Sequence, residues 1–232
     1  MKLKIEKNAT LFKHLIRMFS NAGLETKVEF NDTGVKMLTS DGNNCAMKIN
    51  LTPEFFDVYE PGNEMGIFLS DLNSSIKHMK TITIEEVDNQ LLITSDSVKY
   101  KLPIIENPTT IPDLPGIELK FKQMITFSHL FSALNILTTI SKEQAELKVS
   151  EDNKFTMRAK DGLKEVEYMV IDNTNTNYPC KSYFSIKYLS YIALDSTDSI
   201  LMELDDNKPV RFIFSTDNVR MEYMIAPRVD AF

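Results

Sequence analysis

Two segments, Ala9 to Phe19 and Ser70 to Lys80, have apolar residues at helical spacing and positively charged residues on the opposite face. The polar faces carry Lys13, His14 and Arg17 in the first segment and Lys77, His78 and Lys80 in the second. A row of such side chains is suited to binding a polyanion through its charge alone. Taken by themselves, however, these residues are more simply interpreted as the solvated faces of amphipathic helices.

Residues suited to catalysis are scarce. The three histidines, His14, His78 and His129, all fall in predicted helices. The sequence has no HExxH motif, no glycine-rich phosphate-binding loop and no nucleophile elbow. Its Asp and Glu residues are scattered over turns and strand faces, where solubility explains them. We therefore expect a protein that is not an enzyme and that needs neither cofactor nor metal.

The amino-acid composition and net charge limit which classes of protein remain possible. Hydrophobic residues make up 43% and charged residues 25% of the 232 residues, which is typical of a globular protein. No apolar run approaches the ~20 residues of a membrane span. The net charge of -7 argues against general coating of nucleic acid, so any such contact must be local. Cys45 and Cys180 are far apart and are expected to be buried and unreactive.

Alternating and β-branched segments dominate the first half and predict a protein rich in β-sheet. Asn8 is expected to cap the first helix. Turns are expected at Asn31 to Gly34, Asp41-Gly42 and Asp88-Asn89. The predicted strands are Lys2 to Glu6, Thr26 to Phe30, Val35 to Thr39, Ala46 to Asn50, Gly66 to Leu69, Thr81 to Glu86, Leu91 to Thr94 and Val98 to Leu102.

A proline-containing segment interrupts this pattern near the middle of the chain. Residues 103–116 contain four prolines and no sustained period, which predicts an extended, ordered strap lying against the surface. We therefore expect an N-terminal domain over residues 1–102 and a C-terminal domain over residues 117–232, joined by this strap.

Short sequence echoes in the second half indicate a tandem repeat. Each is too short to carry weight alone, but the three occur in the same order at similar offsets. They are Phe12-Lys13-His14-Leu15 with Phe127-Ser128-His129-Leu130, Ser75-Ile76-Lys77-His78-Met79 with Ser185-Ile186-Lys187-Tyr188-Leu189, and Ser95-Asp96-Ser97-Val98-Lys99 with Thr216-Asp217-Asn218-Val219-Arg220.

The ordered set of short motifs resembles the proliferating cell nuclear antigen (PCNA) family of DNA sliding clamps, in its archaeal and viral forms. The resemblance runs over nearly the whole chain, and its weight comes from the set rather than from any one motif. The motifs are Asp32 to Met37, Lys77 to Lys80, Asn207 to Phe212 and the C-terminal segment Met221 to Val229.

This resemblance implies an α+β clamp fold: two tandem sheet-rich domains, each with two short helices, with helices lining a ring and sheets outside. It further implies a homotrimeric ring with pseudo-six-fold symmetry that an ATP-driven clamp loader places on duplex DNA. The expected function is that of a DNA polymerase processivity factor, which encircles DNA and tethers replication and repair proteins.

The resemblance places Lys13, Lys77 and Lys80 against DNA, and charge and periodicity extend that role to His14, Arg17, His78 and Lys187. One difference from the family pattern weakens the expected contact with DNA. Residues 128–139, in the main helix of the second half, contain no Lys or Arg, which leaves His129 and Lys142 nearby. The contact is otherwise expected to shift to Lys120, Lys122 and the first domain.

A second expected site binds short peptides of partner proteins between the strap and the C-terminus. Ile111 and Leu114 have an alternative role, which is to pin the strap to its own sheet, and both roles are compatible. The residues that resemble the family's pocket are Leu38, Ile111, Pro112, Leu114, Pro209, Ala226, Pro227 and Arg228.

Ring closure requires that edge strands of neighbouring copies pair. By resemblance these are Val98 to Leu102 from one copy and Val166 to Ile171 from the next, although either segment fits an internal strand as well. The interface side chains are Val98, Tyr100, Leu102, Val166, Tyr168 and Val170.

Two alternatives remain open: a clamp-fold processivity factor that acts as a monomer or in a heteromeric ring, and a protein-binding scaffold that does not encircle DNA. The expected location is intracellular. It is the cytoplasm or nucleoid in an archaeon, the nucleus in a eukaryote and the host's replication site for a virus.

Overall fold

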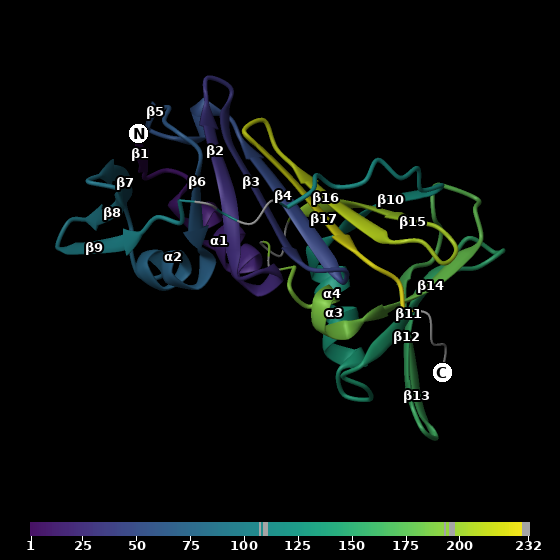
Figure 1. Cartoon of the computed structure of the whole chain (residues 1–232). Helices are drawn as coiled ribbons and strands as arrows, with labels where there is room; N and C mark the ends of the chain where they lie inside the picture. The colour runs from purple at the N-terminus through teal and green to yellow at the C-terminus, as the bar shows by residue number, and fades with distance from the viewer. Residues whose placement is uncertain (107, 109–110, 193, 195–197, 229–232) are drawn as a thin grey trace. The chain divides into compact units, whose positions relative to one another are not determined.

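Strands alternate with two helices in the first half of the chain, and the second half repeats the order. The computed structural model describes residues 1–106, 108, 111–192, 194 and 198–228 (Figure 1). The first half contains β1 (Lys2–Ile5), α1 (Ala9–Ala22), β2 (Glu25–Asn31), β3 (Gly34–Asp41), β4 (Cys45–Leu51), η1 (Pro53–Phe55), β5 (Val58–Glu60), β6 (Met65–Phe68), α2 (Leu69–Ile76), β7 (Ile82–Val87), β8 (Gln90–Ser95) and β9 (Val98–Pro103). The second half contains β10 (Phe121–Thr126), α3 (Phe127–Leu137), β11 (Gln144–Val149), β12 (Phe155–Asp161), β13 (Lys164–Ile171), β14 (Cys180–Ser185), α4 (Ile186–Leu189), β15 (Ser199–Leu204), β16 (Val210–Ser215) and β17 (Val219–Ile225).

The chain divides into two compact units. Unit 1 consists of Met1–Asp41, Ala46–Leu114 and Ser215–Met221, and unit 2 of Gly42–Cys45, Pro115–Phe214 and Glu222–Phe232. Unit 1 contains a sheet in the order β5-β1-β7-β8-β9 and the neighbouring strands β6-β2-β3-β4. Unit 2 contains a sheet in the order β14-β11-β12-β13 and the neighbouring strands β10-β15-β16, while β17, which follows β16 in the sheet order, has its first residues in unit 1 and its last residues in unit 2. The domain boundaries expected at residues 102 and 117 stay a prediction.

The strand orders of the two units correspond. Strands β1-β7-β8-β9 match β10-β15-β16-β17, and β6-β2-β3-β4 match β14-β11-β12-β13. The three sequence echoes fall on corresponding elements: the first helix (α1 and α3), the second helix (α2 and α4), and the turn before the last strand (β9 and β17). The predicted tandem repeat is therefore present in the fold.

Within the chain, β17 is also the hydrogen-bonded neighbour of β4. In unit 1 the backbone N–H of Thr52 donates to the carbonyl of Asn218 at 3.1 Å. In unit 2 the N–H of Ala226 donates to the carbonyl of Asn44 at 2.8 Å. In the repeat, β9 corresponds to β17 and β13 corresponds to β4.

The predicted strands of the first half are all present, with ends that shift by at most two residues. Between β7 and β8, Asp88 and Asn89 have φ angles of 51° and 59°. Two successive positive φ angles are typical of the tight hairpin turn whose twist matches that of its strands. Strand β5 was not predicted, because three residues are too few to show alternation.

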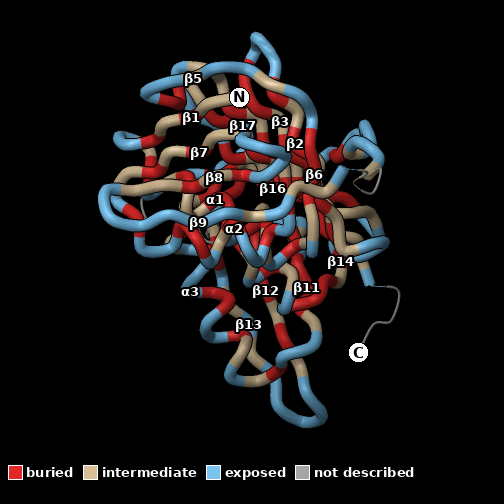
Figure 2. The backbone as a smooth tube through the Cα atoms, turned by 60° about the vertical axis from the view of Figure 1, so that its left-hand side comes forward, coloured by how far each residue is buried: buried red, intermediate tan, exposed pale blue. Residues whose placement is uncertain are grey.

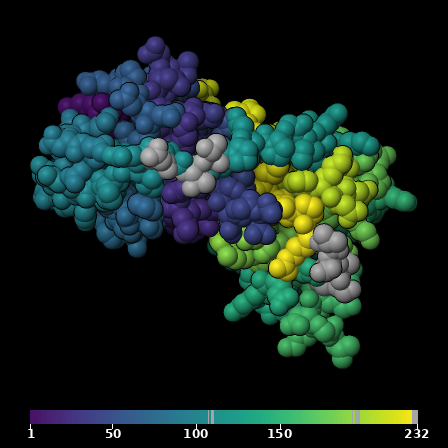
Figure 3. Space-filling model, viewed as in Figure 1, coloured from purple at the N-terminus to yellow at the C-terminus, as the bar shows by residue number. Residues whose placement is uncertain are grey.

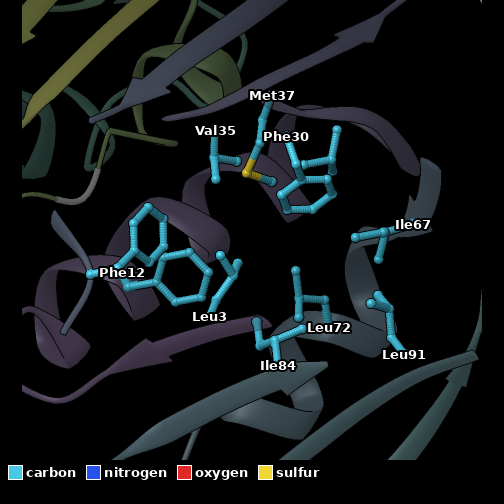
Figure 4. Close-up of a pocket in the computed structure, with 11 residues that line it drawn as sticks. Leu3, Phe12, Phe30, Val35, Met37, Ile67, Leu72, Ile84 and Leu91 are labelled. Carbon is cyan, nitrogen blue, oxygen red and sulfur yellow. The ribbon is translucent and has the colours of Figure 1, made fainter. Parts of the chain in front are cut away.

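The core of unit 1 forms where the apolar face of α1 meets the sheets. Phe12, Leu15, Ile16 and Phe19 are at most 4% exposed, and burial of each such side chain contributes roughly 1.5–3 kcal/mol. Beside Phe12, a small cavity of about 20 Å³ is lined entirely by apolar side chains, as Figure 4 shows. A gap of this size and character is a packing imperfection rather than a ligand site.

Two local predictions about the helices are wrong. Helix α2 ends at Ile76, so Lys77, His78 and Lys80 follow the helix instead of lying on it. The N–H of Met79 donates to the carbonyl of Ile76 at 3.0 Å, which forms a tighter turn that buries Met79. A three-residue turn and a helix both place residues 76 and 79 on one side, so periodicity alone does not distinguish them.

The Asn8 side chain does not cap α1. Its Nδ2 instead donates to the carbonyl of Phe55 in η1 at 2.7 Å, where it satisfies an acceptor from a distant part of the chain.

The strap begins where β9 ends, and it is anchored to β6. Ile105 and Gly66 exchange both backbone hydrogen bonds, at 3.0 and 2.9 Å. Residues 104–106, 108 and 111–116 belong to no helix or named strand, while residues 107, 109 and 110 lie outside the described part of the chain. That the whole segment 103–116 is an extended, ordered strap stays a prediction. Gly66 is required here because a Cβ at this position would lie 2.7 Å from the Cβ atoms of Ile105 and Pro108.

We predict that Gly66→Ala loosens the strap and lowers the free energy of unfolding by roughly 1–3 kcal/mol, because the added methyl group overlaps the strap. Limited proteolysis followed by mass spectrometry should show faster cleavage within residues 103–116. Gly116→Ala is the matched control, since a Cβ there meets nothing within 4 Å. Equal cleavage of both variants would show that this close approach does not hold the strap.

Candidate functional site

The cations predicted on the first two helical segments come together in unit 1. Helix α1 packs against α2, and the Lys13 Nζ donates to the carbonyl of Met79 at 3.0 Å. This bond places the polar side of α1 beside the turn that follows α2. Arg17, Lys77, His78 and Lys80 are exposed, and Lys13 and His14 are half-buried. We call these six residues the cationic patch.

Unit 2 has a different surface at the corresponding helices. On α3 the exposed side chains include His129, Phe131 and Asn135, but no Lys or Arg. On α4 the Lys187 Nζ lies 5.2 Å from the centre of the Tyr188 ring and 6.0 Å from that of Tyr191. These rings attract the ammonium group and restrict its position. The expected weakness of positive charge on α3 is present in the structure.

Lys120 and Lys122, which were expected to compensate, are both engaged within unit 2. The Lys122 Nζ lies 3.2 Å from the buried Glu203 carboxylate, and the Lys120 Nζ lies 5.1 Å from the centre of the Tyr178 ring. They therefore offer less free charge than the sequence suggested.

Both segments predicted for ring closure are edge strands. Strand β9 is the last strand of the five-stranded sheet of unit 1, and β13 is the last strand of the four-stranded sheet of unit 2. The alternative that either is internal is thereby excluded. Figure 2 shows β9 without a buried stretch, and Val98 and Tyr100 are each 42% exposed. Leu102, Val166 and Tyr168 are half-buried, and Val170 is buried.

An exposed apolar residue on α3 was not identified from the sequence. Helix α3 packs against β13, and Phe131 on this helix is 52% exposed. The available signal was an aromatic residue on the polar side of an amphipathic helix, which is hard to separate from core packing without the structure.

The unit 1 residues of the predicted peptide site lie in and around the strap. Leu38 on β3 is buried, Ile111 and Leu114 are half-buried, and Pro112 is exposed. Between them, Asp113 accepts hydrogen bonds from the Lys48 Nζ at 2.8 and 3.0 Å. Lys36 lies farther away, with its Nζ 3.8 Å from Asp113 Oδ2. The hydrogen bond from Lys48 lowers the pKa of the Asp113 carboxyl group.

The unit 2 residues of that site are held by the backbone. Pro209 lies in the turn before β16, and Ala226 follows β17. The N–H of Arg228 donates to the carbonyl of Tyr183 at 2.7 Å, while Pro227 is half-buried. Parts of the yellow C-terminal region reach the face shown in Figure 3, although β17 itself is mostly buried. Val229 lies outside the described residues.

The described residues contain no group of three or more His, Cys, Asp or Glu side chains able to hold a metal ion. Cys45 and Cys180 are both buried thiols, and their burial was predicted. Burial, with Asp206 and Asp205 nearby, raises the pKa of the Cys180 thiol to about 12, so this thiol stays protonated at neutral pH. No helix in the described part of the chain is long and apolar enough to cross a membrane.

Curated proteins similar to this chain are archaeal DNA polymerase sliding clamps. The clamp of Methanospirillum hungatei is 25% identical over 245 residues, covering 99% of both chains. That of Methanothrix thermoacetophila is 26% identical over 245 residues, covering 98% of this chain and 99% of its own. No family model matches the sequence.

Solved structures of PCNA have the same fold. The structure described as the C-terminal region of FEN-1 bound to A. fulgidus PCNA matches with a TM-score of 0.88 at 20% identity, covering 100% of this chain and 99% of that one. PCNA from Thermococcus kodakaraensis matches with a TM-score of 0.86 at 19% identity, covering 98% and 99%. The PCNA2-PCNA3 complex of Sulfolobus tokodaii matches with a TM-score of 0.85 at 15% identity, covering 99% and 100%. The predicted fold class is confirmed.

The Lys48–Asp113 pair has a testable pH dependence. Because the pKa of Asp113 is lower in the folded chain than its ordinary value of about 3.9, the pair contributes stability above about pH 4. That contribution is lost as the pH falls through the folded-state value. We predict that Lys48→Met raises the Asp113 pKa, measured by NMR titration of its carboxyl carbon.

Lys36→Met is the matched control, and it should shift the pKa less because of its longer distance to the carboxylate. Equal shifts in the two variants would contradict the assignment of Lys48 as the main partner.

Proposed function

We propose that this chain, which by sequence and fold is similar to the PCNA sliding clamps, is a DNA polymerase processivity factor that closes with two further copies into a ring around duplex DNA. The predicted resemblance to that family is confirmed by the sequence comparison over the whole chain and by the shared fold. In this function the chain is a mechanical tether without catalytic activity of its own.

The ring assembly is inferred from one observation about the strand order. The unpaired edges β9 and β13 are the counterparts, in the repeat, of β17 and β4, which are neighbours within the chain. Pairing β9 of one copy with β13 of the next repeats that arrangement and leaves neither edge exposed. Because the two edges differ, the contact is head-to-tail, and head-to-tail contacts form rings when the rotation closes.

The cationic patch supports contact with the DNA backbone. Duplex DNA carries about one charge per ~1.7 Å of its axis, and exposed Lys and Arg side chains bind phosphates without reading the sequence. Such contacts allow a ring to slide. Because the chain has a net charge of -7, strong binding of an open form to DNA is unfavourable. Closure of the ring is therefore what would keep the protein on DNA.

Partner capture is the second part of the proposal. One structural neighbour is described as PCNA bound to the C-terminal region of FEN-1. By similarity, we assign peptide binding in this chain to the strap residues Ile111 to Leu114 with Leu38, and to Pro209 and Ala226 to Arg228. Binding of replication and repair proteins here would tether them to DNA.

The ring predicts a mass of three chains of 26.6 kDa in solution. Light scattering coupled to size-exclusion chromatography over a dilution series measures it. A stable mass of three chains supports the proposal. A single-chain mass at every concentration would instead favour a monomeric factor or a subunit of a heteromeric ring.

Lys77→Ala/Lys80→Ala should weaken DNA binding about tenfold and reduce the slope of log affinity against log salt by about two, because two phosphate contacts are lost. Fluorescence anisotropy with a labelled duplex measures both quantities. Lys148→Ala/Lys181→Ala removes the same charge from paired positions on β11 and β14 and serves as the control. An equal loss in both variants would refute a local DNA-contacting patch.

A further inference from the structure

The two free edges carry opposite charge on corresponding faces. On β9, Tyr100 is opposite Ile93, which is buried, whereas Lys99 is opposite Thr94 and Lys101 is opposite Leu92. Residues directly opposite on neighbouring strands point to the same face of a sheet. Tyr100 therefore lies on the buried face of the sheet, and the two lysines lie on its outer face.

Strand β13 has the same division with the opposite sign. Val166 is opposite Ala159 and Tyr168 is opposite Met157, and both partners are completely buried. Glu165 and Glu167 are opposite Lys160 and Arg158 on the other, outer face. Each edge thus presents apolar residues inward and a pair of like charges outward.

Three of these four charges have no ion pair within the described part of the chain: Lys99, Lys101 and Glu167. Glu165 is paired with Arg158, whose Nε lies 2.9 Å from Glu165 Oε1. Arg158 lies on the neighbouring strand β12, so it holds this carboxylate on the outer face of the sheet. All four residues are exposed.

We propose that Lys99 and Lys101 on β9 recognise Glu165 and Glu167 on β13 of a second copy of this chain, and that this charge pairing dictates head-to-tail assembly. The inference rests on the proposed ring and names the residues that give it direction. Alignment of the inner faces places Tyr100 and Val98 beside Val166 and Tyr168, and the same alignment brings lysines against glutamates outside.

The charges also disfavour the wrong assemblies. Pairing β9 with a second β9 would oppose lysines to lysines, and pairing β13 with β13 would oppose glutamates to glutamates. Like charges directly opposite in a sheet are destabilising, whereas opposite charges each contribute a favourable cross-strand interaction. Only the head-to-tail combination satisfies both edges, and both complementary charges reside in one chain, which favours copies of itself over a different partner.

Charge reversal tests the proposal through assembly measured by analytical ultracentrifugation. Lys99→Glu/Lys101→Glu gives a chain with two acidic edges, and Glu165→Lys/Glu167→Lys gives one with two basic edges. Each should assemble with a dissociation constant at least about tenfold larger than that of the unaltered protein. The quadruple variant, with both edges reversed and the net charge still -7, should recover assembly.

The two double variants should also associate with each other when mixed, since an acidic β9 then meets a basic β13. Lys142→Glu/Lys148→Glu is the matched control: it makes the same change in net charge and leaves β9 and β13 intact, and it should assemble normally. Circular dichroism and thermal melting of every variant verify folding, and increasing salt should weaken assembly of the unaltered chain.

The outcomes separate this inference from the ring itself. If the unaltered chain remains a single copy, the ring and the inference both fail. If it assembles and the folded double variants assemble equally well, the charge pairing is overturned while the ring stands. Failure of the folded quadruple variant to recover assembly would likewise overturn the pairing.

Discussion

A β-strand at the edge of a sheet presents unpaired N–H and C=O groups along one side. The need to pair these groups is the constraint on which the proposed assembly depends. Within the chain, β17 is hydrogen-bonded to its neighbour β4, so the backbone groups on that side are paired. Their counterparts in the repeat, β9 and β13, are the last strands of their sheets in the described part of the chain. An open edge with exposed Val98 and Tyr100 would promote uncontrolled association unless a defined partner covered it. In the proposed ring, β9 of one copy and β13 of the next cover each other, and the contact is directional because the two edges differ.

The same constraint explains how an acidic chain can serve on DNA. With a net charge of -7 the protein as a whole repels a polyanion, and its cationic patch is confined to α1 and the turn after α2. Helix α3 adds no Lys or Arg. Weak, sequence-independent contacts are unsuited to tight binding but compatible with sliding. In this account retention comes from closure of strands between copies, and the patch serves to position the duplex.

Much of the fold could be predicted from the sequence, because alternation and turn chemistry are local. Strands such as Glu25–Asn31 and the Asp88-Asn89 turn depend on residues next to one another. The end of α2 and the role of Asn8 could not be predicted, because both depend on distant parts of the chain. Met79 turns into the core and Asn8 donates to Phe55, and neither contact has a signal in the local sequence.

The candidate functional sites were also predictable from the sequence only in part. The cations of the patch were visible as a polar face, and their convergence depends on the bond from Lys13 to Met79. The sequence does not distinguish an edge strand from an interior strand at β9 and β13, because that distinction requires the strand order of each sheet. The engagement of Lys122 by Glu203 and the exposure of Phe131 likewise depend on packing. The pairing of unlike charges on the two edges becomes visible only when register assigns each residue to a face.

Encirclement of DNA is the central claim, and retention on duplexes with blocked ends tests it most directly. The protein would be incubated with linear duplex DNA, both ends would then be blocked with a bulky protein, and the salt concentration would be raised before bound protein is counted. The account predicts that protein threaded over the free ends is retained on the blocked DNA, escapes when a nuclease cuts the duplex, and is absent from DNA blocked beforehand. Equal loss of protein from blocked and open DNA at high salt would contradict a closed ring and leave only electrostatic association.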